Sequence, residues 1–256
     1  MSGVGREPMR IRHCHAGDEA AWDAFVNAHP WGSPLHLIAW RRVIEESFQY
    51  KPLYLLMERE GRIRAVLPLF LVDTLLTGKI LLSTPFAVYG GILADDDEAT
   101  QAMHDHVRQL GEAMQVQHIE LRNRDASQCA GWARVDRYVT FVTPVGPDGH
   151  AILGALPRET RRMTRRAIEQ NYAARQTRDL TSFEGLYLEN LRKLGTPAFP
   201  RRYFASLMRH FPEAEIQEVS LDGKVVAAVL SFYFRDQVMP YYGASDPAIN
   251  RANPNN

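Results

Sequence analysis

The chain has 256 residues, 45% hydrophobic and 23% charged, which are the proportions of an ordinary soluble globular protein. Its 30 Lys and Arg balance its 30 Asp and Glu, so no field of the whole molecule attracts nucleic acid or a membrane. Cys14 and Cys129 form no spaced disulfide framework, the polar residues 1–12 form no signal peptide, and the apolar run 65–76 is too short to span a bilayer. We therefore expect a cytoplasmic protein.

The first half of the chain predicts two helices, the first carrying Trp22 and the second beginning at Ser33-Pro34 and carrying Trp40. A strand, a Glu60-Gly61 turn and a long returning strand over 62–70 follow. Beyond them the sequence predicts a glycine-containing loop, a helix and two more strands. They are the segments 83–91, 103–114, 118–122 and 138–143.

The second half repeats this order of elements. Two predicted helices and a strand lead to an Asp222-Gly223 turn, and a returning strand covers 224–232. Turn glycines this far apart indicate repeated domains rather than a solenoid. After Gly223 the chain holds fewer elements than after Gly61, so we expect the second domain to be truncated, with an exposed strand edge beside 238–243. The predicted domains are 1–147 and 148–256.

A basic helix opens the second half. On a helix over 157–166 the arginines occupy an arc of roughly 140°, with Leu156, Met163 and Ala167 on the opposite side. Arginine forks bind phosphate oxygens in bidentate fashion. A solvated surface helix is the other interpretation of this pattern, although such a face usually mixes Glu with Lys.

Two further segments carry candidate site residues. The loop 194–204 ends one helix at Gly195 and delivers Arg201 and Arg202 to the start of the next. The strand 238–243 carries Tyr241 and Tyr242, which strand alternation would place on opposite faces of the sheet.

The chain resembles the FemAB-type proteins, which are tandem pairs of domains with the GNAT fold of N-acyltransferases. It is most similar to the branch associated with exosortase and PEP-CTERM exopolysaccharide systems. The resemblance rests on stretches spread over nearly the whole chain, namely 36–40, 67–70, 85–91, 120–122, 194–201 and 240–243. It implies an α/β fold with mixed sheets in tandem GNAT-like domains, the second incomplete.

The resemblance also implies a reaction and a set of ligands. Related enzymes transfer an aminoacyl group from aminoacyl-tRNA to a cell-wall precursor, and a basic residue after the second helix's tryptophan helps hold the precursor's phosphate. Arg42 or its neighbour Arg41 stands in that place. The basic helix, represented by Arg161, Arg162 and Arg165, matches the family's basic helix, and Tyr242 matches an aromatic position at the transfer site.

In amide formation the attacking amine has to lose a proton, and the oxyanion that develops needs hydrogen-bond donors. The candidate catalytic residues are His36, Tyr89 and Tyr242, although His36 could also simply pack against Trp40. The remaining candidates are substrate-binding residues: Arg42, Arg41, Arg161, Arg162, Arg165, Arg201, Arg202 and Tyr241. The sequence has no Ser/His/Asp order, HExxH, Walker loop or CxxC pair, so we expect no hydrolase, metal or nucleotide-triphosphatase site.

Three functions remain open. The first is an acyl or aminoacyl transferase that forms an amide on a phosphate-bearing precursor of the cell envelope or an exopolysaccharide, small or lipid-linked. The second is a non-catalytic module that binds a phosphorylated ligand or RNA. The third is a simple N-acetyltransferase that uses CoA. We expect no tightly bound cofactor, and a donor that is either aminoacyl-tRNA or acyl-CoA. The absence of glycine from 246–256 argues against a CoA donor held by a glycine-rich loop.

Overall fold

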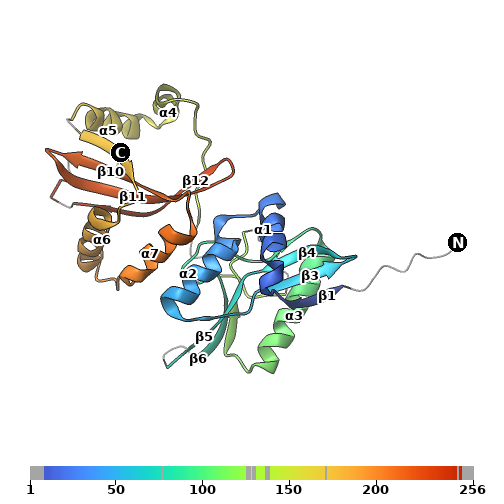
Figure 1. The fold of residues 1–256 in the computed structure, drawn as a ribbon. Coiled ribbons are helices and arrows are strands. Elements are labelled where there is room, and N and C mark those ends of the chain that lie inside the picture. Colours follow the sequence, from blue (N-terminus) through green and yellow to red (C-terminus); the bar gives the residue numbers. More distant parts are fainter. Residues whose placement is uncertain are drawn as a thin grey trace. The chain divides into compact units, whose positions relative to one another are not determined.

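The computed structural model describes residues 9–75, 78–124, 128, 131–135, 139–170, 172–246 and 248–249. These residues belong to two compact units, Met1–Tyr138 and Val139–Asn256, which are described separately (Figure 1). Helices and strands combine in three four-stranded sheets, two in the first unit and one in the second. The mixed α/β class is therefore confirmed, whereas a boundary at 147/148 stays a prediction.

The first unit contains two sheets, and the returning strand of the hairpin leads directly from one sheet into the other. Its antiparallel sheet has the order β1-β3-β4-β7, from β1 (Arg10–His13), β3 (Leu55–Arg59), β4 (Arg62–Leu67) and β7 (Leu93–Ala94). Its second sheet has the order β2-β5-β6-β8, from β2 (Lys51–Pro52), β5 (Leu69–Thr74), β6 (Gly78–Ser83) and β8 (His118–Glu120). Only β8 is parallel to its neighbour there. The helices are α1 (Glu19–Ala28), α2 (Ile38–Phe48) and α3 (Asp97–Ala113).

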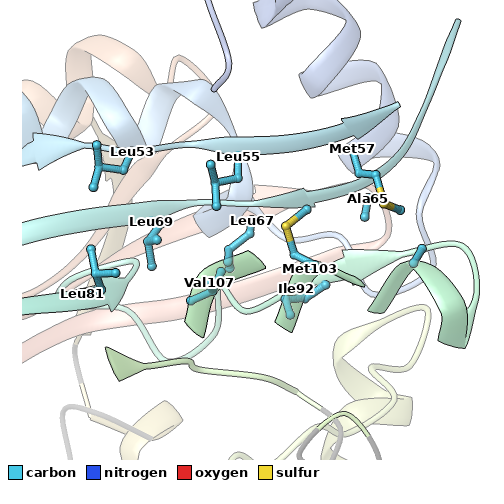
Figure 2. Packing of buried hydrophobic residues seen from close by; sticks show 11 residues of the cluster. Leu53, Leu55, Met57, Ala65, Leu67, Leu69, Leu81, Ile92, Met103 and Val107 are labelled. Atoms are coloured by element: carbon cyan, nitrogen blue, oxygen red, sulfur yellow. The ribbon is translucent and has the colours of Figure 1, made fainter. Parts of the chain in front are cut away.

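One hydrophobic cluster of this unit lies between the strands and α3. Figure 2 shows leucines of β3, β4, β5 and β6 meeting Met103 and Val107 of α3. Met103 and Val107 are one helical turn apart, so both lie on the face of α3 that is turned to the sheet. Leu55, Leu67 and Leu69 are fully buried. This packing fixes the strands on which the glycine-containing loop is mounted.

The described residues of the second unit form one antiparallel sheet and four helices. The sheet order is β12-β11-β10-β9, from β9 (Tyr172–Thr177), β10 (Glu215–Leu221), β11 (Lys224–Phe234) and β12 (Gln237–Ser245). The helices are α4 (Gly149–Ala155), α5 (Arg158–Ile168), α6 (Thr181–Leu194) and α7 (Arg201–His210). Buried aromatic residues of α6 and α7, among them Phe183 and Phe204, form the core with Ile216 and Leu230.

The repeated hairpin is confirmed in detail. Glu60 and Gly61 have φ of 53° and 69°, and Asp222 and Gly223 have φ of 50° and 77°, as a type I′ turn requires. In each hairpin the returning strand has a bulge three residues after the glycine, at Arg64 and Val226 respectively. β1 and β9 pair antiparallel with the outgoing strands of these hairpins. A tandem arrangement of two GNAT-like domains stays a prediction.

Three element boundaries differ from the predictions. The returning strand 62–70 is split at Pro68, because proline has no N–H for the ladder, and its two parts join different sheets. Ser33-Pro34 begins a short 3-10 helix, while α2 starts at Ile38, whose N–H is capped by the Asp23 carboxylate at 2.9 Å. Residues 139–143 form no strand, and Tyr138 lies outside the described residues.

Among the described residues β12 is a terminal strand of its sheet, so the predicted edge beside 238–243 is present in this part of the chain. Residues 247 and 250–256, which come after β12, lie outside the described residues, and truncation of the second domain stays a prediction.

Arg178 stabilises the end of α7 through hydrogen bonds from its side chain. Its guanidinium donates to the backbone carbonyls of Met208, Phe211, Pro212 and Ala214. Without this guanidinium, the carbonyls of Met208, Phe211 and Ala214 would lose their hydrogen-bond donor. Because these residues are buried, water would replace that donor poorly. We predict that Arg178→Met lowers the free energy of unfolding in urea by about 1–2 kcal/mol. The exposed Arg192 of α6 is the control, and equal effects of the two substitutions would contradict this role.

Candidate functional site

The loop between β6 and β7 is held in a conformation that few residues adopt. Thr84, Phe86 and Gly90 have φ of 39°, 60° and 129°. At Gly90 an added Cβ would lie 1.8 Å from Thr84 Oγ1, so this position excludes any side chain. Backbone conformations of this kind occur often at functional sites, where the surrounding structure has to maintain them.

Arg122 maintains this loop. Its Nη1 donates to the carbonyls of Ala87 at 2.5 Å and Thr84 at 3.3 Å, and its backbone N–H donates to Ser83 Oγ at 2.8 Å. The Gly91 N–H donates to the Arg122 carbonyl at 3.0 Å. Two stretches far apart in the sequence that carry the family resemblance, 85–91 and 120–122, are therefore in direct contact.

A small hollow beside this loop brings together two predicted catalytic residues. Its lining includes His36, Tyr89, Gly91 and Arg124. The guanidinium of Arg124 lies 5.4 Å from the centre of the Tyr89 ring, a cation–π contact. The hollow therefore offers a phenol beside a cation, with an imidazole in its wall.

His36 is a neutral, buried imidazole. Its Nδ1 lies 2.8 Å from Ser33 Oγ, and its backbone carbonyl accepts a hydrogen bond from Trp22 Nε1 at 2.8 Å. Burial lowers the pKa of His36 to about 3, against an opposing hydrogen bond with the backbone of Gly91. The ring can therefore orient a polar group at neutral pH but carries no charge.

The two predicted phosphate ligands of the first unit share one carboxylate. Arg41 Nη2 lies 2.5 Å from Glu19 Oε1, and Arg42 Nη2 lies 2.5 Å from Glu19 Oε2. Arg41 also pairs with Glu45 at 3.3 Å and has only 16% of its side chain exposed, against 49% for Arg42. Of the two arginines, Arg42 is therefore the more accessible to a ligand.

In the second unit, two tyrosine hydroxyls form a pair inside an aromatic cluster. The hydroxyls of Tyr203 on α7 and Tyr242 on β12 are 2.7 Å apart. Rings of Tyr187, Phe199 and Phe204 lie with their centres 5.3–6.5 Å from that of Tyr242. Burial raises the pKa of Tyr242 well above its ordinary value, and burial also raises the pKa of Tyr203. Both hydroxyls therefore stay protonated at neutral pH and can donate hydrogen bonds.

The prediction that Tyr241 and Tyr242 point to opposite faces is wrong. Leu230 pairs with Tyr242 and Ser231 with Pro240, so Tyr241 is the extra residue of a bulge. A bulge interrupts strict alternation and re-aims side chains. The two tyrosine rings consequently lie 4.9 Å apart, and Tyr241 packs at 5.5 Å against Phe232.

The predicted arginines of the second unit fall into different environments. Arg161 Nη2 donates to the carbonyls of Gly154 and Leu156, at 2.9 and 2.8 Å, and so joins α5 to the end of α4. Arg162 pairs with Glu159, and Arg201 pairs at 2.8 Å with Glu184, whose side chain is 10% exposed. Arg165 and Arg202 are exposed on their helices.

Sequence reasoning did not assign several residues that the structure brings to these sites. They are Glu19, Ser33, Arg122, Arg124, Glu184 and Tyr203. Arg122 lies within one of the stretches that carry the resemblance, 120–122, so its place in that stretch was an available signal, whereas Tyr203 lies just beyond the stretch 194–201. The others act through contacts between distant segments, which no local pattern indicates.

No group of three or more His, Cys, Asp or Glu residues in the described ranges could hold a metal ion. None of the helices that the structure describes is long and apolar enough to cross a membrane.

Comparison with known proteins finds a matching domain family and solved structures with a similar fold. Residues 155–256 match the family model "Acetyltransferase (GNAT) domain". The chain is similar to the crystal structure of FemX, with a TM-score of 0.72, 17% identity, and coverage of 96% of this chain and 83% of that one. No curated protein sequence matches the chain.

Two other solved structures share the fold at lower similarity. One is a conserved protein of unknown function from Bacteroides thetaiotaomicron, with a TM-score of 0.56, 12% identity, and coverage of 96% of this chain and 83% of that one. The other is the C-terminal domain of a putative lysylphosphatidylglycerol synthetase from Agrobacterium fabrum, with a TM-score of 0.51, 10% identity, and coverage of 93% and 71%. Over most of its length, this chain therefore has a FemX-like fold, and its last part matches a GNAT domain.

The buried state of His36 predicts a pH dependence of stability. Its pKa is about 3 in the folded protein and 6.5 ordinarily, so between these values the unfolded chain binds a proton that the folded one refuses. The free energy of unfolding should therefore fall as the pH drops below 6.5, with a limiting slope of about 1.4 kcal/mol per pH unit from this residue. Urea unfolding of wild type and His36→Gln between pH 7.5 and 4.5 tests this, because the variant should have the shallower slope. Parallel slopes would refute the assignment.

Proposed function

We propose that this protein is an N-acyltransferase or aminoacyltransferase that forms an amide on a phosphate-bearing precursor. The observation that carries the proposal is the match of residues 155–256 to a GNAT domain, because this stretch contains the Tyr203–Tyr242 pair and Arg201. The FemX-like fold and the FemAB-like motifs of both units support the same reaction class.

The chemistry suits the tyrosine pair. An amine that attacks an ester or thioester carbonyl creates an oxyanion, and donors placed in a dry site stabilise that charge. The Tyr242 hydroxyl is 2.7 Å from the Tyr203 hydroxyl, and the Tyr242 ring, which is half-buried, packs among aromatic rings. Since the pKa of Tyr242 is raised, its role is hydrogen-bond donation to the reacting group rather than removal of the amine proton.

The accessible arginines are assigned to phosphate. Arg42 in the first unit is 49% exposed, and the Arg201 side chain in the second is 83% exposed. Each arginine is held by a carboxylate from the preceding helix, Glu19 or Glu184. These pairs orient the guanidinium while leaving further N–H donors for a phosphate oxygen. Arg41 and Arg202 are secondary candidates for phosphate binding, and Tyr89 and His36, which line the small hollow of the first unit, stay candidate catalytic residues.

The finer assignment follows the resemblance to the exosortase-associated FemAB branch. It gives a cytoplasmic enzyme whose acceptor is an envelope or exopolysaccharide precursor, small or lipid-linked, and whose donor is aminoacyl-tRNA. The second candidate is an N-acetyltransferase that uses acetyl-CoA, which the description of the matching domain favours.

Donor preference separates the two candidates. Purified protein is incubated with a radiolabelled aminoacyl-tRNA mixture or acetyl-CoA, together with an amine acceptor that carries a diphosphate. Amide formation from aminoacyl-tRNA supports the proposal, and formation from acetyl-CoA alone supports the second candidate. Binding of the diphosphate without transfer from either donor would reject both and leave a binding module.

The arginine assignment predicts a defect in binding. Arg42→Gln and Arg201→Gln should each raise KM for the phosphate-bearing acceptor by about tenfold or more, with kcat changed little, because a charge-assisted contact contributes about 1.5–3 kcal/mol. Arg62→Gln, at an exposed position of β4, is the matched control. An unchanged KM in both site variants would contradict the assignment.

A further inference from the structure

The aromatic residues around the Tyr203–Tyr242 pair differ in their exposure. Tyr187, Tyr203 and Phe204 are buried. Phe199 is only half-buried, and the centre of its ring lies 4.7 Å from that of Tyr203 and 6.1 Å from that of Tyr242. Phe199 therefore packs against both members of the hydroxyl pair and still presents part of its surface to a ligand.

The short loop between α6 and α7 holds Phe199 in this place. Residues 195–198 of the loop are exposed, whereas the ring of Phe199 packs onto the aromatic cluster. The Tyr187 hydroxyl forms a hydrogen bond with the backbone of Phe199. Pro200, whose ring restricts the backbone, follows directly and leads into α7. The Phe199 ring is thus preorganised beside the hydroxyl pair.

The charged side chains next to this loop are paired with each other. Arg201, two residues after Phe199, donates from Nε and Nη2 to one carboxylate oxygen of Glu184, at 2.9 and 2.8 Å. A charged group placed against the Phe199 ring would lose hydration, which costs free energy unless a partner compensates for it. An apolar group in the same place would gain free energy, because its surface and that of the ring leave water. The surroundings of Phe199 therefore favour an apolar group.

We propose that Phe199 is a specificity-determining residue that selects a transferred group with an apolar side chain. The inference rests on the proposed function, in which the Tyr242 hydroxyl donates to the carbonyl under attack. In that reaction the amide C–N bond forms, the C–O or C–S bond to the donor breaks, and the leaving oxygen or sulfur takes up the amine proton. The side chain of the transferred group is attached beside this carbonyl, so it lies within reach of the Phe199 ring.

A comparison of donors tests the proposal with the full chain. The transferred group is varied in two series, leucyl-, glycyl-, aspartyl- and lysyl-tRNA on one side and isovaleryl-, acetyl- and succinyl-CoA on the other, with one diphosphate-bearing amine as the acceptor. In the series that supports transfer, kcat/KM for the leucyl or isovaleryl group should exceed that for the small and charged groups by about tenfold or more. Equal values within the series, or a preference for a charged group, would overturn the proposal.

Variants of Phe199 separate selection from packing. Phe199→Ala should lower the ratio of leucyl to glycyl transfer, or of isovaleryl to acetyl transfer, by about tenfold, whereas Phe199→Leu should retain it. A loss of stability alone would reduce both rates equally and leave this ratio unchanged. Tyr233→Ala, which removes a 44% exposed ring of β11, is the control.

An unchanged ratio in a folded Phe199→Ala protein, or an equal fall in the control, would overturn the proposal. Amide formation without any preference among donors would reject the selection by Phe199 alone. No amide from any donor would reject the proposed function, and this inference with it.

Discussion

The register of each unit depends on a hairpin turn that requires two successive residues with positive φ. Glycine meets this requirement at Gly61 and Gly223, and the preceding Glu60 and Asp222 accept the same region at a modest cost. Since side chains alternate along a strand, a slip of one residue would turn the core leucines toward water. The turn and the bulge that lies three residues after its glycine therefore set which side chains of the hairpin face the helices of their unit.

In the second unit this register extends to the candidate site. Leu230 is paired with Tyr242, and the bulge at Tyr241 comes directly before it, so the geometry of β12 is set from β11. Helix α7 then supplies Tyr203, whose hydroxyl meets that of Tyr242. A protonated phenol beside a second hydroxyl in a half-buried aromatic cluster is suited to stabilising charge that develops during reaction. The bulge in β12 thus positions Tyr242, and the packing of α7 positions Tyr203.

The sequence predicts the repeated elements of the fold better than its site. Turn glycines and helical periodicity are local signals, and they gave the hairpins around Gly61 and Gly223 correctly. The bulge at Tyr241 was missed because register shifts depend on the partner strand, which no local pattern reports. The pairing of Arg42 with Glu19 and the contacts of Arg122 with the 84–91 loop depend likewise on tertiary contacts between segments 23 or more residues apart.

The central claim is that the Tyr242 hydroxyl donates a hydrogen bond in the transition state of acyl transfer. Single-turnover transfer by Tyr242→Phe tests it most directly, with Tyr241→Phe as the control on the same strand. Loss of one such donor should slow the chemical step by about a hundredfold and leave acceptor affinity nearly unchanged. A rate equal to that of wild type in a folded Tyr242→Phe protein would contradict the account.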